Sequence, residues 1–237
     1  MEDHPQEMTI WQHFDELRKR LLYALISLVA GVIISLIFAD FLLVLVARPI
    51  GGFENLQSIQ VTENLSVYFR ITLLSGFILS LPFMLVQLYL FAAPALKDKE
   101  RKWIFRAVPL ATVLFCSGSL FAFFVMLPAA IPFMVTFPGP NVLPKWRDYV
   151  NFVTSIVFWV GLSFETPLVM YVLAKLGIVD AKGLAKQWRI AIVIIAIVAA
   201  VVTPTPDPIN MAILMAPLLV LYLLGILLAS LARRKAE

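Results

Sequence analysis

Apolar residues fill long blocks of the chain, and charged residues are confined to the shorter stretches between these blocks. Several blocks reach the roughly 18 residues that a helix needs to cross a bilayer. Six blocks can be drawn, and we predict a transmembrane helix in each: 21–47, 67–92, 103–127, 152–174, 189–202 and 211–232. The pattern therefore predicts an all-α, polytopic membrane protein that forms a single integral membrane domain over residues 1–237.

The fifth block is shorter than the others. Its purely apolar part, 190–202, has 13 residues. As a helix it would be about 20 Å long, against a hydrocarbon core of about 30 Å, so it must thin the bilayer locally or draw polar groups into it. The sequence TPTPDP at 203–208 follows it. Because each proline lacks the N–H donor of a helix, we predict a tight external turn there.

The two other external loops, 48–66 and 128–151, differ from flexible linkers in composition. The second holds five prolines, but also Phe, Val and Trp146. This mixture is typical of a folded cap that rests on the bundle.

The basic residues predict how the chain is oriented in the membrane. Of the 19 Lys and Arg residues, all but four lie on the side of the two termini, and the exceptions are Arg48, Arg70, Lys145 and Arg147. Cytoplasmic loops of membrane proteins carry an excess of Lys and Arg. We therefore expect both termini in the cytoplasm.

The overall composition excludes several classes of protein. With 61% hydrophobic and 14% charged residues, a soluble globular protein is excluded. The single cysteine, Cys116, cannot form an intramolecular disulfide, and the only histidines, His4 and His13, lie outside the apolar blocks. No nucleotide-binding or zinc motif is present, so we expect no cofactor, no metal site and no nucleic-acid partner. The first apolar block is too long for a secretory signal, and we expect the amino-terminal segment to be retained.

Glu165 lies near the middle of the apolar block 152–174. A carboxylate at that depth costs about 2.5–3.5 kcal/mol on insertion scales, so it normally faces a protein interior or a water-filled cavity and has a function there. Pro167 would free the carbonyl of Ser163 and add polarity at the same place. The alternative is a structural hydrogen bond to a neighbouring helix.

Two clusters of charged residues lie on the predicted cytoplasmic side. The first, HFDELRKRL at 13–21, would form an amphipathic helix that lies against the membrane before the chain turns across it. In it, Glu16 and Arg20 are spaced for an ordinary i,i+4 ion pair. The second, 91–102, predicts a turn at Pro94 and a short exposed helix at 96–102, or simply a solvated basic loop.

Four segments in order resemble the TatC family, the polytopic core subunit of the twin-arginine protein translocase. They are HFDELRKRL at 13–21, FAAPAL at 91–96 with ERK at 100–102, GLSFETP at 161–167, and TPTPDP at 203–208. The resemblance implies a concave, cupped bundle of six helices in the bacterial cytoplasmic (inner) membrane. It further implies a receptor for the twin-arginine signal peptides of folded preproteins, which are transported at the expense of the proton motive force.

The resemblance also implies roles for individual residues. Glu16 and Glu100 match the acids that meet the arginine pair, and the neighbouring matched positions are Leu17, Arg18, Phe91 and Arg101. Glu165 matches the intramembrane acid that faces the concave cavity. The external turn, where partners dock, includes Thr203, Asp207 and Met211. The implied partners are TatA-type and TatB-type single-span subunits near the fifth and sixth spans, further copies of the chain, and the lipid bilayer. Asn210, Met211 and Leu223 depart from the family pattern, which leaves the details of docking open.

Paired glutamates suit paired arginines for a physical reason. A guanidinium offers two parallel donors to one carboxylate, which an ammonium cannot do, so this arrangement discriminates against lysine. Exposed ion pairs contribute only about 0–1 kcal/mol each, whereas micromolar binding needs about 8 kcal/mol. Most of the affinity must therefore come from the apolar part of the signal and from partner subunits.

Two other classes of function are open to a protein with an acid in a span. A secondary transporter or ion channel could use Glu165 as a midplane ion or proton site. Against this stand a single buried acid, no buried basic partner and no internal repeat. An intramembrane enzyme would need a nucleophile and base within the spans, and the apolar blocks contain no such pair.

Overall fold

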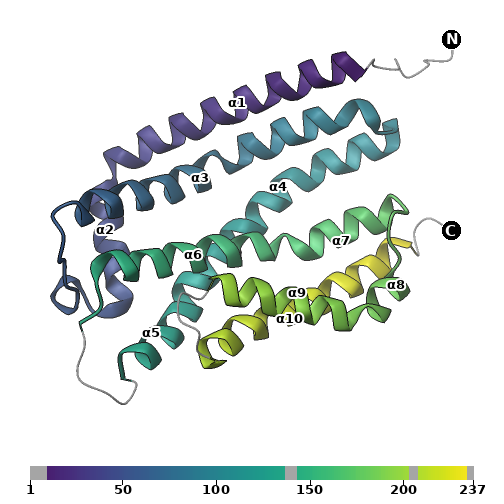
Figure 1. Ribbon diagram of the computed structural model, residues 1–237. Helices are drawn as coiled ribbons and strands as arrows, with labels where there is room; N and C mark the ends of the chain where they lie inside the picture. Colours follow the sequence, from purple (N-terminus) through teal and green to yellow (C-terminus); the bar gives the residue numbers. More distant parts are fainter. Residues whose placement is uncertain (1–9, 137–142, 203–207, 234–237) are drawn as a thin grey trace, which may run out of the picture.

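The protein is a bundle of long helices, as seen in the computed structural model of Figure 1. The structure describes residues 10–136, 143–202 and 208–233, so the predicted site residues Thr203 and Asp207 lie outside the described residues. The helices are α1 Ile10–Ile37, α2 Ala39–Ala47, α3 Glu63–Ala92, α4 Asp98–Phe121, α5 Leu127–Thr136, α6 Trp146–Phe164, α7 Thr166–Lys175, α8 Ala181–Lys186, α9 Trp188–Val202 and α10 Pro208–Arg233. The start of α1 and the end of α10 lie at the same end of the bundle, which we call the terminal end; the opposite end, with residues 48–62 and 143–145, is the loop end (Figure 1).

Five apolar helical stretches in the described residues are long enough to cross a membrane: Trp11–Ile37, Glu63–Ala95, Glu100–Pro132, Trp146–Lys175 and Met211–Ala232. Helix α9 is apolar but has only 15 residues. At 1.5 Å per residue it is about 22 Å long, shorter than the hydrocarbon core. The fold is therefore an all-α, polytopic membrane protein, and its fifth apolar block is short, as the sequence indicates.

The first span differs from its prediction. Helix α1 runs without a break from Ile10 to Ile37, so the chain does not turn between an interfacial lead-in and the span. No Gly or Pro separates the charged residues 13–20 from the apolar ones, and a helix continues through such a sequence. The break lies instead at Phe38, after which α2 begins with the exposed Asp40 in its first turn.

Two segments predicted as separate pieces are parts of long helices. The predicted short helix at 96–102 is the first part of α4, which begins at Asp98 directly after the 3-10 turn Ala93–Ala95. The predicted loop 128–151 is helical at both of its ends. A π-helical turn, Ala122–Met126, joins α4 to α5, and the helix continues through Pro128 to Thr136.

The fourth span is interrupted at Glu165. Its backbone N–H donates to the carbonyl of Leu162, 3.1 Å away, which closes a tighter turn than an α-helix does. Helix α7 then begins at Thr166, with Pro167 in its first turn. A proline at this position interrupts the preceding hydrogen-bond ladder, as its place in the sequence predicts.

Glycines allow close approach between the spans. A Cβ atom on Gly31 of α1 would collide with the carbonyl oxygen of Gly76 on α3, and one on Gly161 of α6 would lie 2.6 Å from Ser119 Oγ of α4. In lipid, helices associate through such close packing because their apolar surfaces gain little by leaving the bilayer. These contacts fix α1 against α3 and α4 against α6.

The loop end forms a folded cap over the bundle. The Gln57 N–H donates to the carbonyl of Pro144 at 3.0 Å, and the Trp146 N–H donates back to Gln57 at 2.9 Å. Trp146 is buried, and the Tyr149 hydroxyl donates to the carbonyl of Val46 at 2.8 Å. The described parts of the two external loops are thus joined to each other, as their composition predicts.

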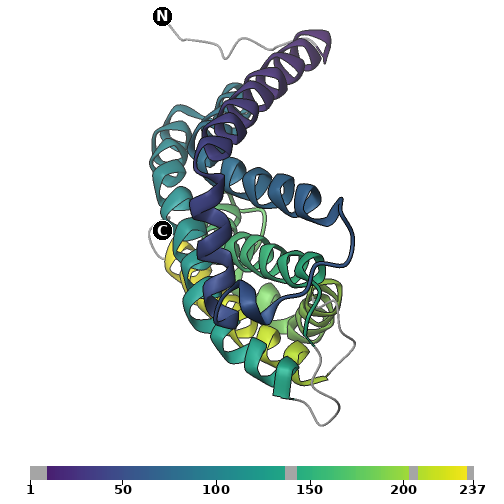
Figure 2. The ribbon, with the colours of Figure 1, turned by 90° about the vertical axis from the view of Figure 1, so that its left-hand side faces the viewer.

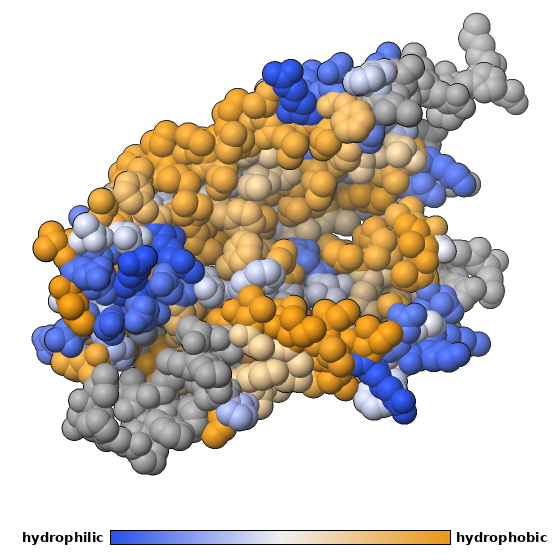
Figure 3. Space-filling model, in the orientation of Figure 1, coloured by the Kyte–Doolittle hydropathy of each residue, from blue (hydrophilic) through white to orange (hydrophobic). Residues whose placement is uncertain are grey.

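The bundle is bent into a cup. In Figure 2 the helices form an arc, with α1 at one edge, and α4 and α10 lie on its convex side. Figure 3 looks onto the concave side and shows a broad hydrophobic belt between two hydrophilic ends, with some polar surface in the hollow. This distribution suits a protein whose middle lies in lipid and whose ends lie in water.

Candidate functional site

The first turns of α1 pack against the last turns of α3 at the terminal end. The Arg20 guanidinium donates to Glu16 Oε1 at 2.6 Å and to Gln87 Oε1 of α3 at 3.2 Å. One turn before Glu16 on α1, the His13 ring stacks on Phe91 of α3, with ring centroids 4.6 Å apart. A carboxylate, an amide and an aromatic ring are therefore held together where α3 ends.

Glu16 has a partner in this structure. Its side chain is 21% exposed and that of Arg20 is 22% exposed, so both are only partly in contact with solvent. The i,i+4 pair that the sequence allows is formed, and it uses one carboxylate oxygen, Oε1. An arginine from outside would have to share this carboxylate with Arg20 or displace it.

Glu100 lies at the start of α4 and caps this helix. Its Oε2 accepts a hydrogen bond from the backbone N–H of Lys97 at 3.0 Å, the reverse half of a capping box. The next residue, Arg101, has an exposed side chain, and its carbonyl accepts from the buried Tyr89 of α3 at 3.4 Å. The turn between α3 and α4 is thereby held closed.

The structure brings the predicted residues together only in part. Leu17 is half-buried and Arg18 is exposed on the same turns of α1 as Glu16. No hydrogen bond or ion pair within the described part of the chain joins Glu16 to Glu100. The last turns of α3 contact both α1 and α4, the helices that carry the two acids.

Glu165 lies half-buried at the break between α6 and α7. Among the described residues its buried Oε1 has no hydrogen-bond partner, and neither has Ser119 Oγ on the adjacent α4. Gly161, one turn before Glu165, packs against Ser119 and Phe115 of α4. A polar atom without a partner in an apolar bundle is costly, which marks this region for a role other than packing.

Sequence reasoning missed two polar residues near the loop end. Arg70 of α3 donates from Nε to Thr154 Oγ1 at 2.8 Å and from Nη2 to Ser155 Oγ at 3.2 Å, both on α6. An arginine inside an apolar block is itself a signal of a polar partner, which the prediction of an external charge does not include.

Glu63 is the other missed residue, and its side chain is only 4% exposed. It accepts backbone hydrogen bonds from Arg147 at 2.7 Å, Ile59 at 2.9 Å and Gln60 at 3.3 Å, and one from the Ser58 hydroxyl at 3.5 Å. The expectation of a single buried acid is therefore wrong. Glu63 precedes the apolar run, so hydropathy gave no sign that it is buried.

No three His, Cys, Asp or Glu side chains in the described ranges lie close enough to hold a metal ion. The carboxylates of Glu16, Glu100 and Glu165 are instead suited to bind cations and polar groups.

These features define a class of protein: a polytopic α-helical membrane protein with acidic residues both at the end that carries its termini and within one span. The family model described as "Sec-independent protein translocase protein (TatC)" matches residues 12–217, and the chain belongs to this family. Membership favours a translocase over the transporter or channel alternative.

Relatives of known name support this membership. The "Sec-independent protein translocase protein TatC" of Carboxydothermus hydrogenoformans is 37% identical over 238 residues, which cover 99% of this chain and 97% of that protein. The protein of the same name from Deinococcus radiodurans is 33% identical, covering 94% of this chain and 86% of that protein. The chloroplastic protein of Pisum sativum is 32% identical, covering 97% of this chain and 66% of that protein.

The fold matches a solved structure. A crystal structure described as that of the twin arginine translocase receptor TatC superposes with a TM-score of 0.83 at 33% identity, covering 94% of this chain and all of that chain (100%). A second crystal structure of TatC, in the detergent DDM, also gives a TM-score of 0.83, at 31% identity, and covers 92% of this chain and 99% of that one. The all-α, polytopic fold predicted from the sequence is confirmed.

Proposed function

We propose that this chain is the receptor subunit of a twin-arginine protein translocase. In this role it binds the twin-arginine signal peptides of folded preproteins at the terminal end. Together with TatA-type and TatB-type single-span subunits, it then supports transport driven by the proton motive force. The membrane is the bacterial cytoplasmic membrane, with both termini on the cytoplasmic side, in accord with the basic residues at the terminal end. Family membership and the matching fold support this role.

One observation carries the proposal furthest: Glu16 is already arranged for a guanidinium. Arg20 occupies it at 2.6 Å and is itself steadied by Gln87. The incoming arginine makes the same kind of bond that the protein makes internally, so the exchange changes little in the surrounding structure. In the same proposal the second arginine binds Glu100, at the start of α4, which follows the turn after α3.

The same geometry explains selectivity without strong affinity. A guanidinium meets a carboxylate with two parallel bonds, which an ammonium cannot match. Each exposed pair contributes about 0–1 kcal/mol, so the two pairs discriminate between signals but do not account for micromolar binding. The apolar segment of the signal and the partner subunits contribute the remainder.

Binding of a signal peptide to the purified, detergent-solubilised protein tests this role. A peptide with Arg-Arg is compared with an otherwise identical peptide with Lys-Lys. The Arg-Arg peptide is expected to bind several-fold more tightly, because only arginine makes the bidentate contact. Equal affinity for the two peptides would show that the two carboxylates do not select arginine over lysine.

We propose that Glu165 acts after recognition, by meeting a polar group on a partner helix. The unpartnered Oε1 at the break of the fourth span supports this role, since a polar group in lipid gains from an interhelical hydrogen bond. The external turn with Thr203, Asp207 and Met211 is the proposed site at which partners dock. In Glu165→Gln, export is expected to fall while binding of the Arg-Arg peptide is retained. Wild-type export in this variant would return Glu165 to a structural role.

A further inference from the structure

A groove between α4, α7 and α10 lies away from the two glutamates at the terminal end. Its volume is about 630 Å³, and leucines of α4 and α10 form much of its apolar wall. Two of the helices that line it, α4 and α10, lie on the convex side of the cup in Figure 2. Neither Glu16, Glu100 nor Glu165 lines it.

The rim of this groove carries two cations, and one of them is held firmly. Lys175, the last residue of α7, has its Nζ 4.4 Å from the centre of the Trp103 ring and 5.4 Å from that of Tyr171. The Nζ also donates to the Tyr171 hydroxyl at 3.3 Å. Trp103 and Tyr171 meet edge to face at 6.4 Å. Arg106, one turn after Trp103 on α4, is the second cation, and no acidic residue is among those that line the groove.

Aromatic and basic side chains occur together at one depth of a bilayer, the level of the lipid headgroups. Trp and Tyr are enriched at the boundary between hydrocarbon and headgroups, and basic pockets between spans on that boundary bind phosphate-bearing lipids. Lys175 and Arg106 lie at the terminal end of the groove, and its apolar walls continue along the spans towards Leu114. A phosphate would meet the two cations, and an acyl chain would lie along the leucines.

We propose that this groove binds an anionic glycerophospholipid from the leaflet at the terminal end of the bundle. The phosphate lies between Lys175 and Arg106, and the acyl chains fill the space between α4 and α10. The site does not depend on the proposed receptor function; only the naming of the leaflet as cytoplasmic rests on the proposed orientation.

The charge of the groove favours a lipid over a helix. A partner helix or a second copy of the chain would have to bring an acid to the two cations. Flexible acyl chains fill an irregular groove of this size, and the phosphate supplies the charge.

Native mass spectrometry of the purified full chain tests the proposal. The protein in neutral detergent is offered phosphatidylglycerol and phosphatidylcholine with the same acyl chains, and the lipid retained on the protein is counted. Wild type is expected to retain phosphatidylglycerol in preference, by about fivefold or more, since each basic residue near an anionic headgroup contributes about that factor. In R106Q/K175Q the preference is expected to fall to near parity.

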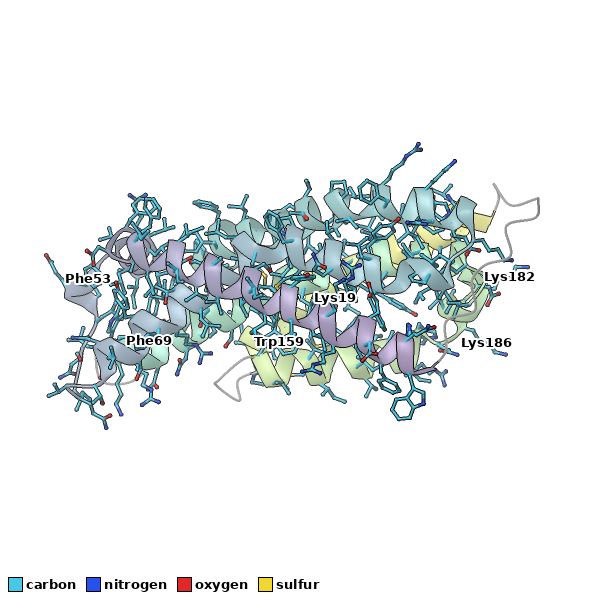
Figure 4. The ribbon with its side chains drawn as sticks, turned by 90° about the horizontal axis from the view of Figure 1, so that it is seen from above. Lys19, Phe53, Phe69, Trp159, Lys182 and Lys186 are labelled. Carbon is cyan, nitrogen blue, oxygen red and sulfur yellow. The ribbon has the colours of Figure 1, made fainter. Side chains whose placement is uncertain are left out.

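A matched control separates this site from general charge. K182Q/K186Q removes two positive charges from α8, whose lysines are exposed at the same end of the molecule (Figure 4). This control is expected to keep the wild-type preference. Equal preference in R106Q/K175Q and wild type would overturn the proposal, and so would an equal loss in both double variants.

A third variant tests the acyl-chain part of the groove without touching the rim. Leu224 of α10 lines the groove, and Leu224→Trp would fill part of it. Both lipids are expected to be retained less, whereas glycerol 3-phosphate without chains should not bind to any form. If Leu224→Trp instead converted a dimer to a monomer and left the retained lipid unchanged, the occupant would be a second copy and the lipid proposal would fail.

Discussion

Two glutamates at opposite ends of the bundle show how differently a carboxylate can be used. Glu63 at the loop end is buried and accepts backbone hydrogen bonds from Arg147, Ile59 and Gln60. Glu16 at the terminal end is partly exposed and bonds a single side chain, Arg20, one turn away on the same helix. The first is tied to segments far apart in the sequence, and the second is tied only to its own helix.

The two carboxylates therefore differ in how much of the structure must move when their hydrogen-bond donors are replaced. To replace the donors of Glu63, the first loop and the start of α6 would both have to move, since these segments supply the backbone groups. To replace the donor of Glu16, one side chain has to turn. A buried acid with fixed donors holds the fold together, whereas a half-exposed acid with a mobile donor is suited to bind a passing arginine.

The strongest test of this contrast is the pair of substitutions E16Q/E100Q. Each removes the charge that a guanidinium needs and keeps the shape of the side chain. With up to about 1 kcal/mol lost at each position, affinity for the Arg-Arg peptide should fall by up to about thirtyfold. Titration of the labelled peptide onto the purified protein measures the change, and the thermal midpoint should stay near that of wild type.

Asp15→Asn is the control for this pair, because Asp15 is an exposed acid on the same turn of α1. It should lower peptide affinity only slightly, by the general effect of one lost negative charge. Undiminished binding in E16Q/E100Q would show that the terminal-end acids do not select the signal.

The opposite outcome is expected at the loop end. In Glu63→Gln one acceptor oxygen becomes an amide donor, which faces the backbone N–H of Arg147 if it replaces Oε1, or those of Ile59 and Gln60 if it replaces Oε2. Because a buried donor is then left without an acceptor, the thermal midpoint should fall by several degrees, with peptide affinity little changed. Circular dichroism in detergent measures the midpoint.

Glu54→Gln serves as the reference, since Glu54 is exposed in the same loop. The thermal midpoint of Glu54→Gln should equal that of wild type. If Glu63→Gln melted with wild type as well, the hydrogen bonds around Glu63 would not hold the cap.

The sequence predicted the spans well and their ends poorly. Hydropathy locates the centre of each span because burial in lipid requires a continuous apolar block. It does not show that α1 begins at Ile10 or that the chain breaks at Phe38, where neither Gly nor Pro is present. The predicted loop 128–151 also begins where α5 is helical, since a Pro-rich segment after an apolar block predicts a loop, although proline is tolerated in membrane helices.

In the candidate site, too, some contacts could be predicted from the sequence and others could not. The pair of Glu16 with Arg20 could be predicted, because i,i+4 spacing on one helix is visible in the sequence. The contacts of Arg20 with Gln87 and of His13 with Phe91 could not, since they depend on how α1 and α3 are aligned. The bond between Glu63 and Arg147, 84 residues apart, is invisible to any local pattern for the same reason.

The smallest expected effect comes from Arg20, and it bears most directly on whether Glu16 exchanges its partner. If Arg20 competes with the signal, Arg20→Ala should raise affinity for the Arg-Arg peptide by about twofold to fivefold, the range of a weak surface pair. Removing any positive charge here would also favour a basic peptide. Lys19→Ala, at an exposed neighbouring position (Figure 4), measures that general contribution. A gain in Arg20→Ala beyond that in Lys19→Ala shows direct competition for the carboxylate. A loss of affinity in Arg20→Ala would mean that Arg20 holds Glu16 in place for the signal, and the idea of an exchangeable partner would be wrong.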